Sequence, residues 1–451
     1  MNTTSQIFDV IISGGGLSGS LMALSLANQR KADGSLLSIA IIEAVKDPNN
    51  ASTKEQVKAQ DNKQSESLKK DTLVSSLFDQ RVLALSHGSS QYLEKLGVWA
   101  DLSSHACAIK DIDISDRGHY GKARLRAKDH GVEALGYVIE MALIGKSLQS
   151  ALKSHKNIAW YFGNTITDIA WHKTNEQGAR TQDAQTKGVH ASDTSSDTSL
   201  VTVTLSNALM LQTSLLLGCD GVNSPCRTLA NITTKESDYE QVALIANVST
   251  NNPHYHKAFE RFTEEGPIAM LPLKSVKAEH RCSLVWTLSK SSYKKVEALD
   301  EASFKKALEN AFGRWLGGIT HVGKKDSYPL VLLQAEQQTY HRMALIGNAS
   351  HTIHPIAGQG FNLGLRDVKE MADLITNALA AKKDIGSFSL LNNYAKSRKT
   401  DHQDVIGLTD SLVTLFSNNL PPLIVGRSIG LKVLNYLTPL KDRLVNKTMG
   451  Y

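Results

Sequence analysis

The chain has 451 residues, about three times the usual length of one domain, so a peptide or a lone small module is excluded. Apolar residues make up 41% and charged residues 21%, which is ordinary globular usage and excludes a disordered, collagen-like or membrane-spanning composition. The net charge of +6 is mild and its cations are scattered. This charge favours an anionic cofactor or an acidic lipid surface, and it argues against nucleic acid as a partner.

Cysteine usage and the apolar segments bear on the compartment. The four cysteines form no C-x-x-C pair, which favours a reducing compartment. Residues 1–7 carry no Lys or Arg, so no secretory signal is expected. The apolar stretches 208–217 and 423–437 are too short, or too interrupted by cations, for a bilayer span of roughly 20 residues. We therefore expect a cytoplasmic protein, with at most a peripheral contact at the inner membrane.

The first elements in chain order are a strand, a glycine turn and a helix. Residues 8–13 are an apolar run of strand length, GGGLSG follows at 14–19, and a helical apolar pattern covers 21–27. Residues 38–43 form a second buried strand that ends in Glu43. This order predicts a parallel β-α-β unit.

Two polar segments interrupt the chain. Residues 45–77 and 172–199 are rich in Lys, Gln, Asn, Ser and Asp, so they cannot bury enough apolar area to offset their ordering entropy. We expect mobile insertions there. The second segment lies between the short segment 166–169 and the alternating strand 200–205, which predicts a hairpin with a long loop.

The remaining elements are also expected to alternate between strands and helices. Further strands are expected at 209–218, at 258–262, 268–271 and 283–288, which look like a separate sheet, and at 343–346. After the glycine-rich run 357–364, helices are expected from 365 to about 381, and from about 389 onward apart from a break at Pro421-Pro422.

The spacing Gly14-x-Gly16-x-x-Gly19 is typical of a dinucleotide site. The first glycine makes the tight turn, the second lets the backbone approach a pyrophosphate, and the third lets helix and strand pack closely. The phosphates would lie at the helix N-terminus, and Glu43 stands at a suitable distance along the chain to bind ribose hydroxyls. These residues alone leave both FAD and NAD open.

Further segments resemble motifs of a known family. Residues 217–227, LGCDGVNSPCR, resemble the Asp-Gly motif of the flavoprotein aromatic hydroxylases, and residues 347–364, GNASHTIHPIAGQGFNLG, are similar to their third motif. Asn348 replaces the Asp that most of the family has, and Asn is itself a feature of the ubiquinone-biosynthesis branch. The segments that resemble this branch, and most of all its 2-octaprenyl-6-methoxyphenol hydroxylases, are 79–86, 115–119, 259–263, 266–267, 283–286 and 407–412.

The resemblance implies an α/β fold of the p-hydroxybenzoate hydroxylase type. It has a Rossmann-like FAD-binding domain of the GR2 type, an inserted mixed β-sheet substrate domain and C-terminal helices. The expected segments are 5–105, 137–235 and 338–395 for the discontinuous FAD-binding domain, 106–136 and 236–337 for the substrate domain, and 396–451 for the C-terminal helical region.

The resemblance also implies the cofactor contacts. The expected FAD contacts are Gly14, Gly15, Gly16, Leu17, Ser18 and Gly19 at the pyrophosphate, Glu43 at the adenosine ribose, Arg81 at the phosphate or ribose, Asp220 and Asn348 near the ribitol, and Pro355, Gly358, Gln359 and Gly360 around the isoalloxazine. A helix starting near Phe361 would point its N–H groups at the flavin. His354 and Pro355 would lie nearest the ring, but no catalytic base can be named. No metal is expected, because no carboxylate or Cys stands at ligand spacing from His351 and His354.

The implied activity is hydroxylation of a polyprenylated phenol, 2-polyprenyl-6-methoxyphenol, to the 1,4-benzoquinol, with FAD as cofactor, NAD(P)H as transient co-substrate and O2. The tail implies an apolar channel and peripheral membrane contact, for which residues 423–437 are a candidate. Helix packing, or contact with other ubiquinone-biosynthesis proteins in an assembly, explains that segment equally well. Three alternatives remain: a sibling hydroxylase acting at another ring position, a flavin reductase or dehydrogenase, and a non-catalytic flavin-bearing assembly subunit.

Overall fold

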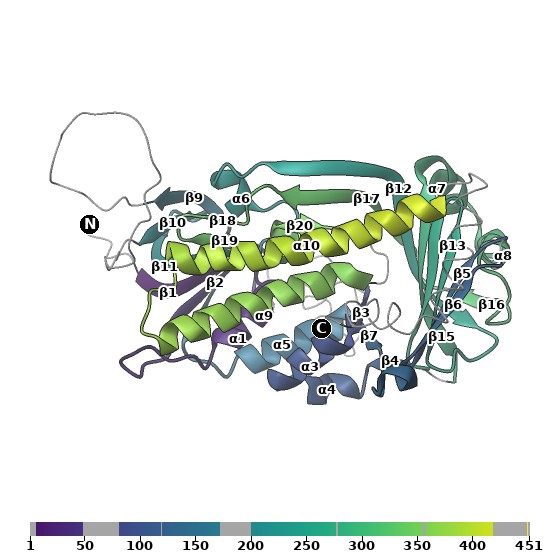
Figure 1. Ribbon diagram of the computed structural model, residues 1–451, viewed down its shortest axis with the longest axis horizontal. Helices are drawn as coiled ribbons and strands as arrows, with labels where there is room; N and C mark the ends of the chain where they lie inside the picture. Colours follow the sequence, from purple (N-terminus) through teal and green to yellow (C-terminus); the bar gives the residue numbers. More distant parts are fainter. Residues whose placement is uncertain are drawn as a thin grey trace, which may run out of the picture.

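The computed structural model describes residues 6–47, 81–118, 120–171, 200–276, 278–354, 358–417 and 449. Figure 1 shows an elongated molecule with one sheet towards each end and two long helices, α9 (Gln359–Ala380) and α10 (Phe388–Ser417), along its length. Both segments that hold most of the predicted polar insertions, 48–80 and 172–199, lie outside the described residues, as does the candidate contact surface 423–437. Among the described residues, no helix is both long and apolar enough to span a membrane.

A mainly parallel sheet contains the predicted β-α-β unit. β1 (Gln6–Ser13) lies at its centre, parallel to β2 (Ile39–Glu43) on one side and to β11 (Met210–Gly218) on the other, so the strands predicted for these segments are confirmed. The other strands of this sheet are β8 (Ile158–Phe162), β9 (Ile166–Trp171), β10 (Val201–Leu205), β18 (Thr339–Tyr340) and β19 (Met343–Leu345). β9 and β10 pair antiparallel, which confirms the predicted hairpin.

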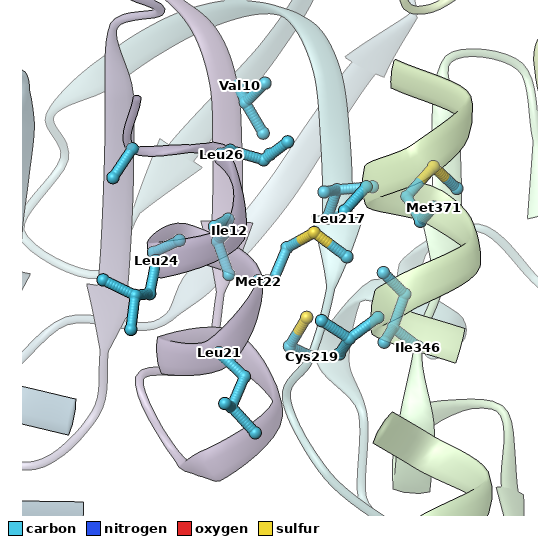
Figure 2. Close-up of a cluster of buried hydrophobic side chains, with 14 of the residues drawn as sticks. Val10, Ile12, Leu21, Met22, Leu24, Leu26, Leu217, Cys219, Ile346 and Met371 are labelled. Atoms are coloured by element: carbon cyan, nitrogen blue, oxygen red, sulfur yellow. The ribbon is translucent and has the colours of Figure 1, made fainter. Parts of the chain in front are cut away.

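Both faces of this sheet are buried, which explains why its strands read as continuous apolar runs. On one face Ile12 and Leu217 pack with α1 (Leu17–Leu26), α9 and α5 (Met141–Leu152). Figure 2 shows Leu217 between Met22 of α1 and Met371 of α9. On the other face, residues of β1 and β11 pack with β9, β10 and α6 (Pro225–Leu229).

An antiparallel-rich sheet forms the other end of the molecule. Its strands are, in order, β20 (His351–Thr352), β17 (Asp326–Ala335), β12 (Thr234–Thr250), β15 (His280–Ser289), β14 (Gly266–Pro272), β13 (Lys257–Thr263), β5 (Asp111–Asp116) and β6 (Lys122–Arg126), with β16 (Ile319–Val322) also on β12. The strands predicted within 257–290 are confirmed as β13, β14 and β15. One face packs on α8 (Glu301–Phe312), through aromatic contacts such as that of Trp286 with Phe304.

A third, three-stranded sheet is formed by strands that lie on both sides of β5 and β6 along the chain. It contains β3 (Val82–Ser86), β7 (Gly136–Glu140) and β4 (Cys107–Ile109), and short elements flank it. The helix predicted to start near Phe361 begins at Gln359, and the helix predicted from about 389 begins at Phe388. The other helices in the described part of the chain are α3 (His87–Lys95), α4 (Trp99–Ser103) and α7 (Lys290–Glu297), with 3-10 turns η1 (Ala127–His130) and η2 (Gly347–Ala349).

Candidate active site

The turn after β1 is so tight that two of its glycines admit no side chain. Gly14 has a φ of +95°, and a Cβ there would lie 2.5 Å from the carbonyl oxygen of Cys219. A Cβ at Gly19 would lie 1.9 Å from the carbonyl oxygen of Gly14, whereas a Cβ at Gly16 would have no heavy atom within 4 Å. α1 begins directly after Gly16 and no side chain caps it. The turn therefore offers open space and uncapped N–H groups where an anion would bind.

Glu43 lies against this turn. Its buried carboxylate accepts the N–H of Gly15 at 2.6 Å and that of Val45 at 2.9 Å. A carboxylate has about four acceptor positions, so two remain for hydroxyl groups of a ligand. The contact of Glu43 with an adenosine ribose stays a prediction.

Asp220 lies at the end of β11, beside the end of β1. Its Oδ2 accepts the Ser13 hydroxyl at 3.2 Å and the Cys226 N–H at 3.0 Å. Its Oδ1 is buried and has no hydrogen-bond partner among the described residues. Because a buried acceptor without a donor is costly, Oδ1 fits a site at which a bound ligand supplies the hydrogen bond.

The third motif packs against the glycine turn. Gly347 has a φ of +62°, and a Cβ there would lie 2.9 Å from the Ser18 hydroxyl. A Cβ at Gly364 would lie 3.2 Å from the Cα of Gly347, so η2, the start of α1 and the first turns of α9 meet closely. Asn348 is exposed on η2. The structure therefore brings Ser18 and Asn348 into one neighbourhood.

The start of α9 is fixed to β3. Gly358 adopts a φ of +63°, and a Cβ there would lie 2.8 Å from that of Ala84. The Asn362 amide donates to the carbonyls of Ala84 and Gly358, both at 2.8 Å, and accepts the N–H of Ser86 at 2.9 Å. No side chain caps this N-terminus, so its N–H groups can face negative charge.

Four other predicted site residues have different outcomes. Gln359 and Gly360 form the first turn of α9, and Gln359 is buried. Arg81 is exposed and directly precedes β3. Pro355 lies outside the described residues.

His354 is a buried imidazole, and neither of its ring nitrogens has a hydrogen-bond partner among the described residues. Burial lowers the pKa of His354 to about 4, so the ring is neutral at pH 7. The ring lies edge-on to Tyr239, with 5.2 Å between centroids, and the Tyr239 hydroxyl donates to Asp410 of α10. A neutral imidazole can both donate and accept a hydrogen bond towards a ligand.

A buried charge centre beneath η2 was missed by the sequence analysis. Asp367 of α9 is fully buried; its Oδ1 accepts from Arg398 Nε at 2.7 Å and from His402 Nε2 at 2.8 Å. Its Oδ2 accepts the Gly347 N–H at 2.9 Å and pairs with His351 Nε2 at 3.0 Å. The sequence spacing did not reveal a carboxylate beside His351, because α9 brings Asp367 to it from 16 residues along the chain.

The same centre has the composition of a metal site but already contains a cation. One ligand atom each of His351, Asp367 and His402 lies within 4.8 Å of the others. Although burial opposes ionisation, His402 and His351 hold the pKa of Asp367 well below its usual range. The Arg398 guanidinium contacts this carboxylate directly, so an ion pair supplies the charge that a metal would bring. The sequence does contain a signal for this buried centre: the acid Asp367 lies between Leu363 and Met371 on the apolar face of α9.

Comparison with known proteins agrees with this geometry. A family described as an FAD binding domain matches residues 70–409, well over half of the chain. The ubiquinone hydroxylase UbiL of Rhodospirillum rubrum is 29% identical, over 99% of this chain and 90% of its own. The mitochondrial ubiquinone biosynthesis monooxygenase COQ6 of Caenorhabditis elegans is 28% identical, over 98% of this chain and 96% of its own. The chain belongs to the FAD-dependent aromatic monooxygenase family.

Solved structures share the fold of this monooxygenase. The p-nitrophenol 4-monooxygenase PnpA of Pseudomonas putida DLL-E4 superposes with a TM-score of 0.69 at 14% identity, covering 99% of both chains. PqsL of P. aeruginosa superposes with a TM-score of 0.67 at 17% identity, covering 95% of this chain and 100% of its own. These similarities confirm the predicted fold class.

Proposed function

We propose that this monooxygenase hydroxylates a polyprenylated phenol, 2-polyprenyl-6-methoxyphenol, to the 1,4-benzoquinol, using O2 and NAD(P)H. Three features that lie together at the carboxyl ends of β1 and β11 carry the proposal. They are the open space at Gly16, the Oδ1 of Asp220 that has no partner among the described residues, and η2 with Asn348. The names of the relatives support the substrate class.

FAD supplies the redox and oxygen chemistry when bound. The N-terminus of α1 would hold the pyrophosphate, with Glu43 at the ribose and Asp220 and Asn348 at the ribitol. The N-terminus of α9, from Gly358, would stabilise negative charge on the reduced ring. The close packing around Gly14 and Gly358 fixes the positions of these helix ends.

The substrate sets two further requirements. Its hydroxyl needs a hydrogen-bond acceptor or base, and the reacting ring must be kept from water. Its apolar tail needs a channel and access to the membrane in which such a lipid resides. We therefore propose a cytoplasmic enzyme with peripheral membrane contact at the inner membrane.

Mass spectrometry of the product tests this proposal. Purified protein is mixed with FAD, NADPH, 18O2 and a short-tailed 2-prenyl-6-methoxyphenol. One labelled oxygen para to the hydroxyl is expected. Label at another carbon would indicate the sibling hydroxylase, and NADPH oxidation without any label would indicate a reductase or dehydrogenase.

A Gly16→Asp variant tests the non-catalytic alternative, because an anionic side chain in the open space at Gly16 should exclude a pyrophosphate. Hydroxylation is expected to disappear together with bound flavin. If the wild-type protein shows no hydroxylation, and its association with partner proteins survives in the variant, an assembly role without catalysis is favoured.

A further inference from the structure

Strand β13 places neighbouring residues in two different environments. Phe259 packs edge-on against Phe312 and Trp315, and the Arg261 guanidinium lies over the Trp315 ring. These two residues therefore face α8. Because successive side chains of a strand point to opposite faces, Glu260 points to the other face of the sheet.

Around Glu260 that other face is apolar, and it packs against the three-stranded sheet beside the candidate flavin site. The cross-strand neighbours of Glu260 are Ile114 of β5 and Ala269 of β14. Ala258, two residues earlier on the same face, packs with Val138 and Val82 of the three-stranded sheet, whose β3 holds the start of α9. α10 contacts both β13 and β14.

Glu260 has no hydrogen bond or ion pair with any described residue, although it is only partly exposed. On the opposite face, Asp113 of β5 pairs with Arg124 at 2.6 Å and with Lys257 at 3.1 Å. Burial alone raises the pKa of Glu260 to about 7. A carboxyl group without a partner in apolar surroundings costs stability. Such a group is typical of a site at which a ligand supplies the missing hydrogen bond.

Other titratable groups lie on the surrounding elements. They are His354 before α9, Glu140 and Arg281, which pair with each other between β7 and β15, Tyr239 and Asp410, which hydrogen-bond to each other, and Asp116 at the end of β5. None of them is among the causes of the raised pKa of Glu260.

We propose that Glu260 is the catalytic base of the monooxygenase: its carboxylate accepts a hydrogen bond from the substrate's phenol and takes the phenol proton as the ring is hydroxylated. In this step the phenol O–H bond breaks, its electron pair stays on the phenol oxygen, and the proton forms a new O–H bond on Glu260. No electron leaves or enters Glu260. The inference rests on the proposed function, since it assigns the base that a phenol substrate requires.

The acidity of the two groups suits this exchange. A phenol has a pKa of about 10, roughly three above that of Glu260, so the bound substrate keeps its proton until attack on the oxidant makes the phenol more acidic. Glu260 must be ionised to act. The rate is therefore expected to rise with pH through about 7 and then level off.

The experiment compares Glu260→Gln with Glu264→Gln in the FAD-loaded protein. Glu264 is an exposed residue of the β13–β14 turn and serves as the matched control. The Glu260→Gln variant is expected to lose about 10²-fold or more in 18O incorporation, to keep its flavin, and to lose the rise in rate near pH 7. The control variant should match the wild type in all three measurements.

A binding measurement without turnover adds a second readout. The flavin absorbance change reports the affinities of 2-prenyl-6-methoxyphenol and of the analogue that lacks the hydroxyl. Wild-type protein should prefer the phenol by at least about tenfold, because a hydrogen bond to a charged acceptor is worth about that factor. The preference should fall in Glu260→Gln.

The outcomes separate this inference from the proposed function. If wild-type protein gives no labelled product, the proposed function fails. If wild-type protein is active and Glu260→Gln keeps its rate, its pH profile and its preference for the hydroxyl, only the role of Glu260 is overturned. A variant that loses activity together with its flavin or its fold also counts against a base, because the residue would then be structural.

Discussion

At the scale of single residues, Asp367 contributes both to the stability of the fold and to the geometry of the candidate site. Its four hydrogen bonds join α9, α10 and η2, and one of them holds the backbone of Gly347 beside Asn348. A carboxylate with four donors and one cationic partner satisfies the conditions under which a buried charge is retained. The residue therefore positions the turn that is proposed to contact the ribitol.

An Asp367→Asn substitution should be strongly destabilising. The amide nitrogen would face donors, and Arg398 would keep its charge without a full partner, so we expect a loss of roughly 3–5 kcal/mol in the free energy of unfolding. Urea denaturation of the apoprotein measures it. Asp373→Asn, which removes an exposed ion pair with Lys369 on the same helix, should cost under about 0.5 kcal/mol. Equal losses in the two variants would contradict the assigned role.

Glu260 gives a prediction about pH and stability that does not depend on catalysis. Its pKa is 4.5 in an unfolded chain and about 7 in the folded protein, so the folded state binds the proton more tightly. Wild-type protein should therefore lose stability as the pH rises from about 4.5 to above 7, by at most about 3 kcal/mol, and by less because the carboxyl is partly exposed. Glu260→Gln should lack this loss. Relative to wild type, it should gain stability between pH 5 and pH 8 in chemical denaturation, and a constant difference would contradict the raised pKa.

At the scale of elements, the β1–turn–α1 unit followed closely from its residues. Apolar runs, glycine spacing and helix period all agreed locally, so strand and helix limits came within a few residues of those observed. Asp367 could not be paired with His351 from sequence, because the contact depends on where a helix returns in space. The long strand β12 was also missed, because its first half is polar and pairs with β17, whereas β15 pairs with its second half.

This unit predicts opposite effects for two neighbouring glycines. Gly16→Ala places its Cβ in open space at an ordinary backbone angle, so the apoprotein should unfold within about 2 °C of wild type. Its FAD affinity should nevertheless fall at least about tenfold, because the Cβ occupies the approach of the pyrophosphate. Thermal unfolding and flavin titration measure the two effects. Gly19→Ala would collide with the Gly14 carbonyl and should lower apoprotein stability clearly; the reverse order would argue against this placement of the pyrophosphate.

At the scale of the whole molecule, α10 links the two large sheets, because it contacts β18 of the parallel sheet and both β13 and β14 of the antiparallel-rich sheet (Figure 1). The fold class could be anticipated because the motifs occur in order along the chain. The position of Glu260 could not, since the strand alternation shows two faces but not which face lies towards the flavin. That information came from the packing of Ala258 on Val138.

The hydrogen bond from Tyr239 to Asp410 gives a test of how the two ends are held together. Tyr239 lies in β12 and Asp410 in α10, so a Tyr239→Phe variant loses a bond between sheet and helix but keeps the ring that packs on His354. A hydrogen bond to a charged group contributes about 1.5–3 kcal/mol, so amide exchange along the second half of α10 and the centre of β12 should accelerate about tenfold or more.

The parallel sheet provides the internal reference for that measurement, and Tyr293→Phe provides the matched variant. Among the described residues, the Tyr293 hydroxyl bonds to Glu297 and Ser327, near the surface of the antiparallel end. Exchange in β1 and β11 should stay unchanged in both variants, because their amides belong to a core that neither hydroxyl reaches. An acceleration spread evenly over the protein in Tyr239→Phe would mean that the bond contributes to global stability rather than to the connection between the two ends.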